Sequence, residues 1–325
     1  MDTKLTGSHA SSNVTFYIGK IPIIGNAILA PMDGITDSPF RQLCKKMGSA
    51  ASVSEFVNAL NLINGHPHIE EQLPFSESER PFAYQIFDNN VSRIVDTAKY
   101  LMKYKPDFID INMGCSNRSV ANRGAGAGLM RDHKKVELLF KTITNTLTVP
   151  VTAKIRLGWD VNELNFLEIA HILEDNGCSC ISLHARTRVQ QYGGKADWDS
   201  IASLVDAVTI PVIGNGDIQH SNQITELISY TGCNAVMIGR AAIGNPWIFQ
   251  KEKQEQISNQ DRYLTMKDHL DLMVEYYEHR GIILFRKHLK KYLSIPDISK
   301  ESIQKAFTFT NPDQLAQYLQ GILHC

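Results

Sequence analysis

The chain has 325 residues, of which 43% are hydrophobic and 21% charged, and its formal net charge is −1. This composition is ordinary for a globular protein with one large domain and a smaller one. The near-neutral charge excludes nucleic-acid binding through bulk positive charge, so any such contact must come from local patches.

Six cysteines are scattered through the chain, and none belongs to a Cys-x-x-Cys pair. We therefore expect no zinc site or iron–sulfur cluster, and no other metal site is predicted. Free thiols in a chain of this size favour a reducing cytoplasm. The sequence has no run of about 18 apolar residues, so no membrane span is expected. The polar N-terminus lacks an apolar signal core, and we expect residues 1–15 to form a loose tail.

Short apolar runs alternate with helical patterns from residue 26 to residue 250. The runs predict strands at 26–31, 51–54, 83–87, 108–113, 150–156, 180–185, 210–214 and 235–239. The intervening patterns predict helices near 38–47, 57–63, 90–104, 133–146, 162–176, 198–208, 221–231 and 241–250. These eight units favour a closed (β/α)8 TIM barrel, placed at 16–252, over an open sheet.

The pattern changes after Gln250, because residues 255–325 contain no clear strand. Helical periodicity recurs near 264–280, 282–294, 299–307 and 312–323. This stretch predicts a small C-terminal all-helical domain, placed at 253–325.

Polar or conformationally special residues stand at the end of nearly every predicted strand. Catalytic groups of a barrel lie at these C-terminal ends and in the loops that follow them. One such residue could be a satisfied core polar group, but the whole set is hard to explain in that way. The set is Pro31, Met32, Asp33, Glu55, Gln85, Asn112, Lys154, Arg156, His184, Arg186, Asn215, Gly216, Asp217, Gly239 and Arg240.

The stretch 107–130 delivers a thiol to a loop. The apolar run 108–113 stops at Gly114, and Cys115 follows at once. Three glycines further on would let the loop backbone approach a ligand closely. A thiol in such a loop is a candidate acid or nucleophile, whereas the alternative is a small buried hydrophobic residue.

Two glycine-rich turns indicate a phosphate site. They read GNGD at 214–217 and GRAAIGNPW at 239–247. Barrels commonly hold phosphate in the loops after strands 7 and 8, and Arg240 would add a charge-assisted bond there. A flavin mononucleotide fits this arrangement, with Lys154 facing the ring where negative charge develops on reduction. Each prediction has an alternative. The glycines could serve only the tight turns, and Lys154 could form a structural ion pair.

Several segments, in this order, resemble the tRNA-dihydrouridine synthases. They are APMDGITDSPFR (30–41), YQIF (84–87), DINMGC (110–115), GAGAGLM (124–130), AKIRLGW (153–159), LHARTR and QYGGKADW (183–198), IPVIGNGDI (210–218) and VMIGRAAIGNPWIF (236–249). The resemblance spans the barrel almost end to end. It implies an FMN-bearing barrel followed by a helical tRNA-binding domain.

The resemblance also implies a reaction and its residues. NADPH would reduce FMN, the flavin would pass hydride to carbon 6 of uracil, and Cys115 would protonate carbon 5. Asn112 and Arg186 match positions near the uracil. The positions that match flavin contacts are Pro31, Met32, Gln85, Lys154, His184, Asn215, Gly216, Asp217, Gly239 and Arg240. A flat uracil must leave its stack to reach such a site, and an acid must stand over the ring.

The sequence departs from the family at one position, because Ser116 follows the cysteine where proline is usual. This change predicts a more flexible loop, or one shaped for another RNA.

The helical stretch contains a candidate RNA-binding patch. The segment RKHLKK places Arg286, Lys287, Lys290 and Lys291 on one side of a helix, where they could follow phosphates. Residues 251–325 contain 11 Lys and Arg against 10 Asp and Glu, so charge alone does not distinguish this patch from a solvated face. The resemblance favours the RNA reading.

The main hypothesis is therefore an FMN-dependent, NADPH-using reductase of uridine in tRNA that works as a monomer. A flavin barrel acting on a free pyrimidine, as dihydroorotate dehydrogenases do, is the nearest rival. Ribosomal RNA is an alternative substrate, and a non-catalytic RNA-binding module is a third reading. The added helical domain favours a macromolecular substrate.

Overall fold

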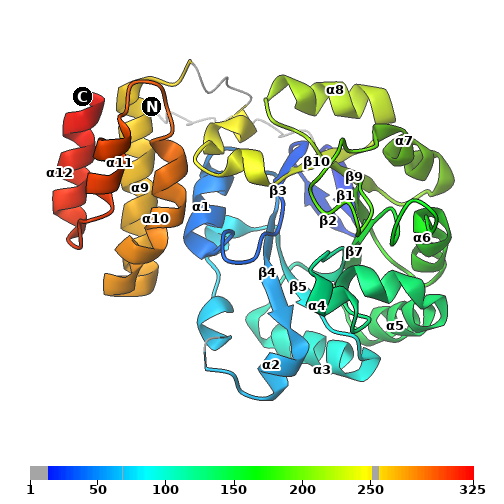
Figure 1. Cartoon of the computed structure of the whole chain (residues 1–325). Helices are drawn as coiled ribbons and strands as arrows, with labels where there is room; N and C mark the ends of the chain where they lie inside the picture. The colour runs from blue at the N-terminus through cyan, green and yellow to red at the C-terminus, as the bar shows by residue number, and fades with distance from the viewer. Residues whose placement is uncertain (1–13, 68, 251–255) are drawn as a thin grey trace, which may run out of the picture.

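The computed structural model describes residues 14–67, 69–250 and 256–325 (Figure 1). Eight parallel strands pair in the order β3-β10-β9-β8-β7-β6-β5-β4. Together with the helices around them they form the predicted (β/α)8 barrel. The strands are β3 (Ala27–Leu29), β4 (Ser52–Asn58), β5 (Phe82–Phe87), β6 (Phe108–Met113), β7 (Val151–Arg156), β8 (Ile181–His184), β9 (Val212–Asn215) and β10 (Ala235–Ile238). The helices are α1 (Ser38–Lys46), α2 (Ala59–Ile63), α3 (Val91–Leu101), α4 (Arg118–Ala121), α5 (His133–Thr146), α6 (Phe166–Asp175), α7 (Trp198–Ala207) and α8 (Asn222–Thr231).

The first and last strands of this order meet at a seam without a regular ladder. The backbone N–H of Ala50 donates to the carbonyl of Ala27 (2.8 Å). The hydroxyl of Ser49 accepts from the N–H of Leu29 and donates to the carbonyl of Ala51, both at 3.0 Å. One backbone bond and one bridging hydroxyl therefore close the barrel.

Alternation along the strands separates the two sides of the barrel wall. In β6, Ile109 and Ile111 belong to the core beneath the outer helices, whereas Asp110 and Asn112 are buried on the other side. Successive side chains of a strand point to opposite faces, so the polar pair lies inside the ring. Every residue of β6 is buried, as is usual for a parallel strand covered on both faces.

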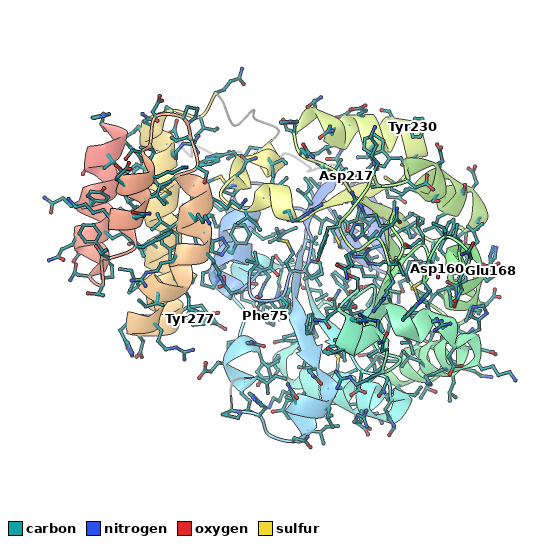
Figure 2. The ribbon with its side chains drawn as sticks, in the orientation of Figure 1. Phe75, Asp160, Glu168, Asp217, Tyr230 and Tyr277 are labelled. Carbon is teal, nitrogen blue, oxygen red and sulfur yellow. The ribbon has the colours of Figure 1, made fainter. Side chains whose placement is uncertain are left out.

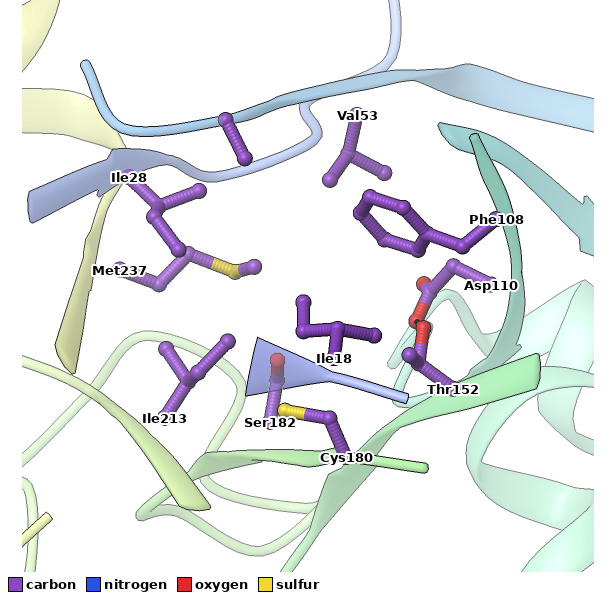
Figure 3. A pocket seen from close by; sticks show the side chains of 11 residues that line it. Ile18, Ile28, Val53, Phe108, Asp110, Thr152, Cys180, Ser182, Ile213 and Met237 are labelled. Carbon is purple, nitrogen blue, oxygen red and sulfur yellow. Dashed lines mark hydrogen bonds between the residues drawn. The ribbon is translucent and has the colours of Figure 1, made fainter. Parts of the chain in front are cut away.

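A hairpin that sequence patterns did not indicate plugs the N-terminal end of the barrel. Strands β1 (Phe16–Ile18) and β2 (Ile21–Ile23) pair antiparallel. Ile18 packs with Phe108, Ile213 and Met237 inside the barrel. A cavity of about 10 Å³, enough for roughly one water molecule, remains there (Figure 3).

Two predicted helices differ from the observed structure. The helix expected at 241–250 is replaced by two short 3-10 helices, η5 (Arg240–Ala242) and η6 (Pro246–Gln250), because Pro246 cannot continue a helix. The helix expected from 162 begins at Phe166, because Gly158 and Leu164 first form a β-bridge.

Four further helices follow the barrel, as predicted: α9 (Asn259–Tyr277), α10 (Gly281–Tyr292), α11 (Lys300–Ala306) and α12 (Pro312–Leu323). They enclose their own apolar core, which includes Met266, Leu270, Phe285 and Leu289. The proposed boundary between 252 and 253 lies outside the described residues, as do residues 1–13 of the expected tail. Within the described part of the chain, no helix is long and apolar enough to cross a membrane.

The helical region packs on one flank of the barrel, against α1 and the loop before β5 (Figure 1). Lys46 pairs with Asp268 at 2.7 Å, and Lys287 pairs with Asp37 at 3.0 Å. The hydroxyl of Tyr276 donates to the carbonyl of Pro74 (3.2 Å), and the neighbouring Tyr277 and Phe75 are labelled on the two sides of this contact in Figure 2. Asp37 follows β3, so the helical region stands beside the C-terminal mouth of the barrel.

Candidate active site

Neighbouring strands bring several predicted site residues together at the barrel mouth. Lys154 of β7 is in register with Asn112 of β6, and His184 of β8 is in register with Asn215 of β9. The ammonium of Lys154 donates to Oδ1 of Asn215 (3.1 Å). The amide of Asn215 in turn donates to the carbonyl of Met237 on β10 (2.7 Å). These bonds connect three strands across the mouth.

Burial determines the charges of the basic residues at the mouth. It lowers the pKa of Lys154 to about 8, an effect that Arg156 increases and Asp110 opposes. Burial also lowers the pKa of His184 far below its ordinary value, with Lys154 as the next largest cause. At neutral pH the mouth therefore holds a charged lysine beside a neutral imidazole.

The phosphate end of the predicted site has exposed positive charge and a tight turn. Asp217, labelled in Figure 2, lies after β9. The guanidinium of Arg240 lies 4.0 Å from Asp217 and 4.8 Å from the centre of the Tyr192 ring, and its side chain is 59% exposed. Gly216 has φ +142°, and a Cβ there would lie 2.5 Å from Cβ of Ala196. Only glycine allows this close approach. The exposure of Arg240 leaves its donors available to an anion.

Pro31 and Met32 form the adjoining wall, and both are partly exposed. A Cβ at Gly239 would lie 3.3 Å from the sulfur of Met32, so these two predicted residues are neighbours. The hydroxyl of Thr36 accepts from the N–H of Met32 (2.9 Å) and closes the turn after β3.

The Cys115 loop is held by the strand end below it. The N–H groups of Gly114 and Cys115 donate to Oδ1 of Asn112 at 3.1 and 2.9 Å. Cys115 is partly exposed. Burial raises the pKa of its thiol, although a backbone N–H of Asn117 and the charge of Arg156 oppose this. The side chain is therefore a protonated thiol at neutral pH.

The glycines of this loop pack against the loop itself. Gly126 has φ +55°, and a Cβ there would lie 2.7 Å from Cβ of Cys115. A Cβ at Gly128 would overlap the carbonyl of Ala121. Gly126 thus packs against Cys115 and Gly128 against Ala121, and both glycines permit the tight path of this loop.

Ser116, the departure from the family pattern, is buried and faces Arg156. Its hydroxyl accepts from Nη2 of Arg156 (3.3 Å), while Nε of the same guanidinium donates to the carbonyl of Gly114 (2.8 Å). Nη1 of Arg156 donates to the carbonyls of Thr187 and Gln191, both at 2.9 Å. Arg156 thus fastens the Cys115 loop to the loop after β8, and Ser116 contributes to that connection.

Arg186, predicted to lie near the uracil, is 2% exposed and extensively bonded. Nη2 donates to both carboxylate oxygens of Asp217 (2.7 and 2.8 Å) and to the carbonyl of Gly194 (2.7 Å). Although burial raises the pKa of Asp217, hydrogen bonds from Arg186 and from the Ala196 backbone hold it below its ordinary value. Arg186 thereby anchors the loop at 193–196 to the turn that contains Asp217.

The four basic residues of the helical patch differ in exposure and in partners. Lys287 reaches the barrel through its ion pair with Asp37, and Nη2 of Arg286 donates to the carbonyl of Phe309 (3.3 Å). Lys290 and Lys291 are exposed. The last two residues are therefore the part of the predicted patch that faces solvent.

Sequence reasoning overlooked the roles of Asp110, Arg156 and Tyr192. Asp110 is a buried acid inside the barrel, and its alternation with Ile109 and Ile111 was the available signal. Tyr192 is exposed between Arg240 and Arg156, with the two guanidinium carbons 4.8 and 5.9 Å from its ring centre. Nothing in the spacing of the sequence indicates that contact.

Comparison with known proteins identifies the family. The family model described as "Dihydrouridine synthase (Dus)" matches residues 28–321. The chain belongs to the dihydrouridine synthase family. It is therefore an oxidoreductase of a flavin-dependent family, as the resemblance implied.

Similar proteins cover nearly the whole chain. tRNA-dihydrouridine synthase B of Vibrio cholerae is 35% identical over 313 residues, which cover 94% of this chain and 97% of that protein. The protein of the same name from Xanthomonas axonopodis pv. citri is 37% identical over 284 residues, covering 85% and 86%. Among solved structures, histamine dehydrogenase from Rhizobium sp. 4-9 has a TM-score of 0.56 at 10% identity, covering 95% of this chain and 64% of that one. This last likeness concerns the fold alone.

Proposed function

We propose that this protein reduces uridines in tRNA to 5,6-dihydrouridine, with bound FMN, NADPH as electron donor and Cys115 as proton donor. The observation that supports this proposal most directly is the thiol of Cys115. It is protonated and partly exposed, in a loop that Arg156 connects to the barrel mouth. A proton donor must keep its proton until carbon 5 of uracil accepts it. A raised pKa suits an acid and does not suit a nucleophile.

The residues at the mouth fit a flavin mononucleotide. Arg240 and the backbone around Gly216 would hold its phosphate, because exposed guanidinium donors and a glycine turn lie together there. Lys154 would hold the ring, offsetting the negative charge of the reduced state. When bound, FMN would supply the hydride that carbon 6 of uracil receives. The neutral His184 would donate or accept one hydrogen bond without adding charge.

The helical region supports a macromolecular substrate, since it stands beside the mouth and presents Lys290 and Lys291 to solvent. In this proposal the protein works as a monomer in the cytoplasm, where its six free thiols stay reduced. A uracil would leave the RNA stack to reach Cys115.

The test uses purified protein, unmodified tRNA transcript and uridine monophosphate. Protein as isolated should absorb in the flavin region and release FMN on denaturation. NADPH should reduce the flavin, and the transcript should reoxidise it and gain dihydrouridine. Turnover of uridine monophosphate at the rate of the transcript would contradict the RNA substrate, and protein that binds no supplied FMN would contradict the cofactor.

A further inference from the structure

A buried acid of the barrel interior is connected to the cysteine loop by a chain of hydrogen bonds. Asp110 is 5% exposed and lines the inner cavity together with Ile18, Val53 and Phe108 (Figure 3). Its Oδ1 accepts from the hydroxyl of Thr152 (2.5 Å). A carboxylate in such apolar surroundings is costly, and burial accordingly raises its pKa. Its presence there calls for a function.

The chain of bonds leads from this acid to the mouth. Oδ2 of Asp110 accepts from Nε2 of Gln85 (2.7 Å), and Oε1 of Gln85 accepts from Nδ2 of Asn112 (2.8 Å). Oδ1 of Asn112 then accepts from the N–H groups of Gly114 and Cys115. All three side chains are buried, with Gln85 1% and Asn112 8% exposed.

The direction of every bond in this chain is fixed by its two ends. Both oxygens of Asp110 accept, from Thr152 and from Gln85, so Gln85 turns its NH₂ inward and its carbonyl toward Asn112. A backbone N–H can only donate, so Asn112 must turn its carbonyl toward Gly114 and Cys115. The two requirements agree. If either amide were reversed, an N–H would face an N–H, or a carbonyl would face a carbonyl.

We propose that Asp110 is a positioning residue for the cysteine: acting through Gln85 and Asn112, it orients both amides and thereby holds the backbone N–H groups of the Cys115 loop. This inference rests on the proposed role of Cys115 as proton donor. Asp110 has no access to substrate. Its effect is to keep Oδ1 of Asn112, and not Nδ2, under the loop.

The decisive comparison is between Asp110→Leu and Asp110→Asn. Leucine removes the acceptor that orients Gln85. Asparagine keeps it, because its NH₂ can donate to the Thr152 hydroxyl while its carbonyl faces Gln85. The matched control is Thr152→Val, which removes a hydrogen bond to the other oxygen of Asp110 at the same depth and leaves the chain to Cys115 intact.

Two readouts separate positioning from general damage. The first is the stopped-flow pair of half-reactions: flavin reduction by NADPH, and reoxidation by unmodified tRNA. The second is the pH profile of Cys115 alkylation by iodoacetamide in FMN-free protein, in a Cys325→Ser background because Cys325 is also partly exposed. Alkylation reports the loop whether or not tRNA proves to be the substrate.

In Asp110→Leu, reoxidation by tRNA should slow about 10- to 100-fold, as expected for a misplaced group, and reduction by NADPH should slow by a smaller factor, since only Gln85 of this chain of bonds is also a predicted flavin contact. The alkylation profile should shift in the same variant. Asp110→Asn should restore both, and Thr152→Val should leave both unchanged even if it unfolds at lower urea concentration. Should Asp110→Leu not fold, Asp110→Ala removes the same acceptor with less bulk.

Wild-type alkylation and reoxidation in folded Asp110→Leu or Asp110→Ala would overturn the inference. So would equal impairment in Asp110→Asn, because charge and not acceptor direction would then be the cause. If wild-type protein fails to convert tRNA but the alkylation profiles shift as described, the proposed substrate fails and the positioning role stands.

Discussion

The ammonium of Lys154 donates to Oδ1 of Asn215, and this bond joins β7 to β9 across the intervening strand β8. It fixes the amide of Asn215 so that its NH₂ donates to Met237 on β10. A charged group at the mouth thus connects to the two strands that lead to the turns proposed to hold phosphate. Because burial lowers the pKa of Lys154 to about 8, the charge of this group is lost as pH rises through that value.

The affinity for FMN should fall as pH rises through about 8. Free protein loses the Lys154 charge near that pH, whereas bound FMN would keep the lysine protonated to higher pH. The measurement is FMN titration of cofactor-free protein from about pH 6.5 to about pH 9.5. Lys154→Arg should remove the transition, because arginine stays charged over this range. A transition retained in Lys154→Arg would assign it to another group.

Arg240→Ala should weaken FMN binding. A charge-assisted bond contributes about 1.5–3 kcal/mol, and the exposure of Arg240 places the effect at the lower end, about tenfold in Kd. Equilibrium dialysis of cofactor-free protein measures it. Lys195→Ala is the matched control, because it removes an exposed positive charge from the loop that contains Tyr192. Equal loss in both variants would make the effect one of general charge and not of phosphate contact.

Cys115→Ala should bind FMN, and NADPH should reduce its flavin at the wild-type rate. The reduced flavin should then transfer little hydride to RNA. General acid catalysis supplies about 10²–10⁴-fold, and reoxidation by tRNA should slow by a factor in that range. Cys325→Ser controls for loss of an accessible thiol. Reoxidation of Cys115→Ala at the normal rate would mean that another residue delivers the proton.

The exposed pair of the helical patch should bind RNA, whereas Lys287 should not. Lys290→Gln with Lys291→Gln should weaken tRNA binding and reduce the salt slope by about 0.7–0.9 for each phosphate that the variant no longer neutralises. The control is Lys134→Gln with Lys141→Gln, the same charge change on α5, which lies away from the helical region (Figure 1). Fluorescence anisotropy at several salt concentrations measures both. Equal slopes for wild type and the α10 variant would place the RNA surface elsewhere.

Acid should destabilise the protein partly through His269, which is fully buried between Phe40, His288 and Tyr292. Burial lowers its pKa to about 3, with Lys287 adding to the effect, so the unfolded chain binds its proton first. The contribution is fully present above the unfolded pKa of about 6.5 and is lost as pH falls toward 3. At pH 5 the loss is about 2 kcal/mol.

Urea unfolding of wild type and His269→Gln at about pH 7.5 and about pH 5 checks this prediction. The change in unfolding free energy between the two pH values should be about 2 kcal/mol smaller in the variant. The comparison cancels titration of groups common to both proteins, including Glu55, whose pKa burial raises to about 7. An unchanged pH dependence would show that His269 is protonated in the folded state.

The barrel could be predicted because short apolar strands alternate along the chain with longer segments that have helical periodicity. The strands carry enough apolar residues in a row to stand out, and the site follows from which residues end them. The β1–β2 hairpin escaped prediction because each strand has three residues, too few for a period to register. Which of the four basic residues stay exposed depends on how α10 packs, and that is decided by its tertiary contacts, such as those of Lys287 and Arg286. The orientation of the Gln85 and Asn112 amides depends on hydrogen-bond partners, which strand periodicity does not reveal.

The seam between β3 and β4 differs from the other strand pairs of the described barrel wall, because it has no regular ladder of hydrogen bonds. Elsewhere in the described sheet, neighbouring strands share ladders, but this joint depends on Ser49 and Ala50. The chain beyond β3 carries Met32, Asp37 and α1, and so it carries the attachment of the helical region through Lys287 and α9. Force on the helical region would therefore reach the ring beside the one joint of the described sheet that lacks a regular ladder. The same joint borders the wall formed by Met32, so on the proposed function a bound RNA would be mechanically connected to the cofactor side of the mouth through this segment.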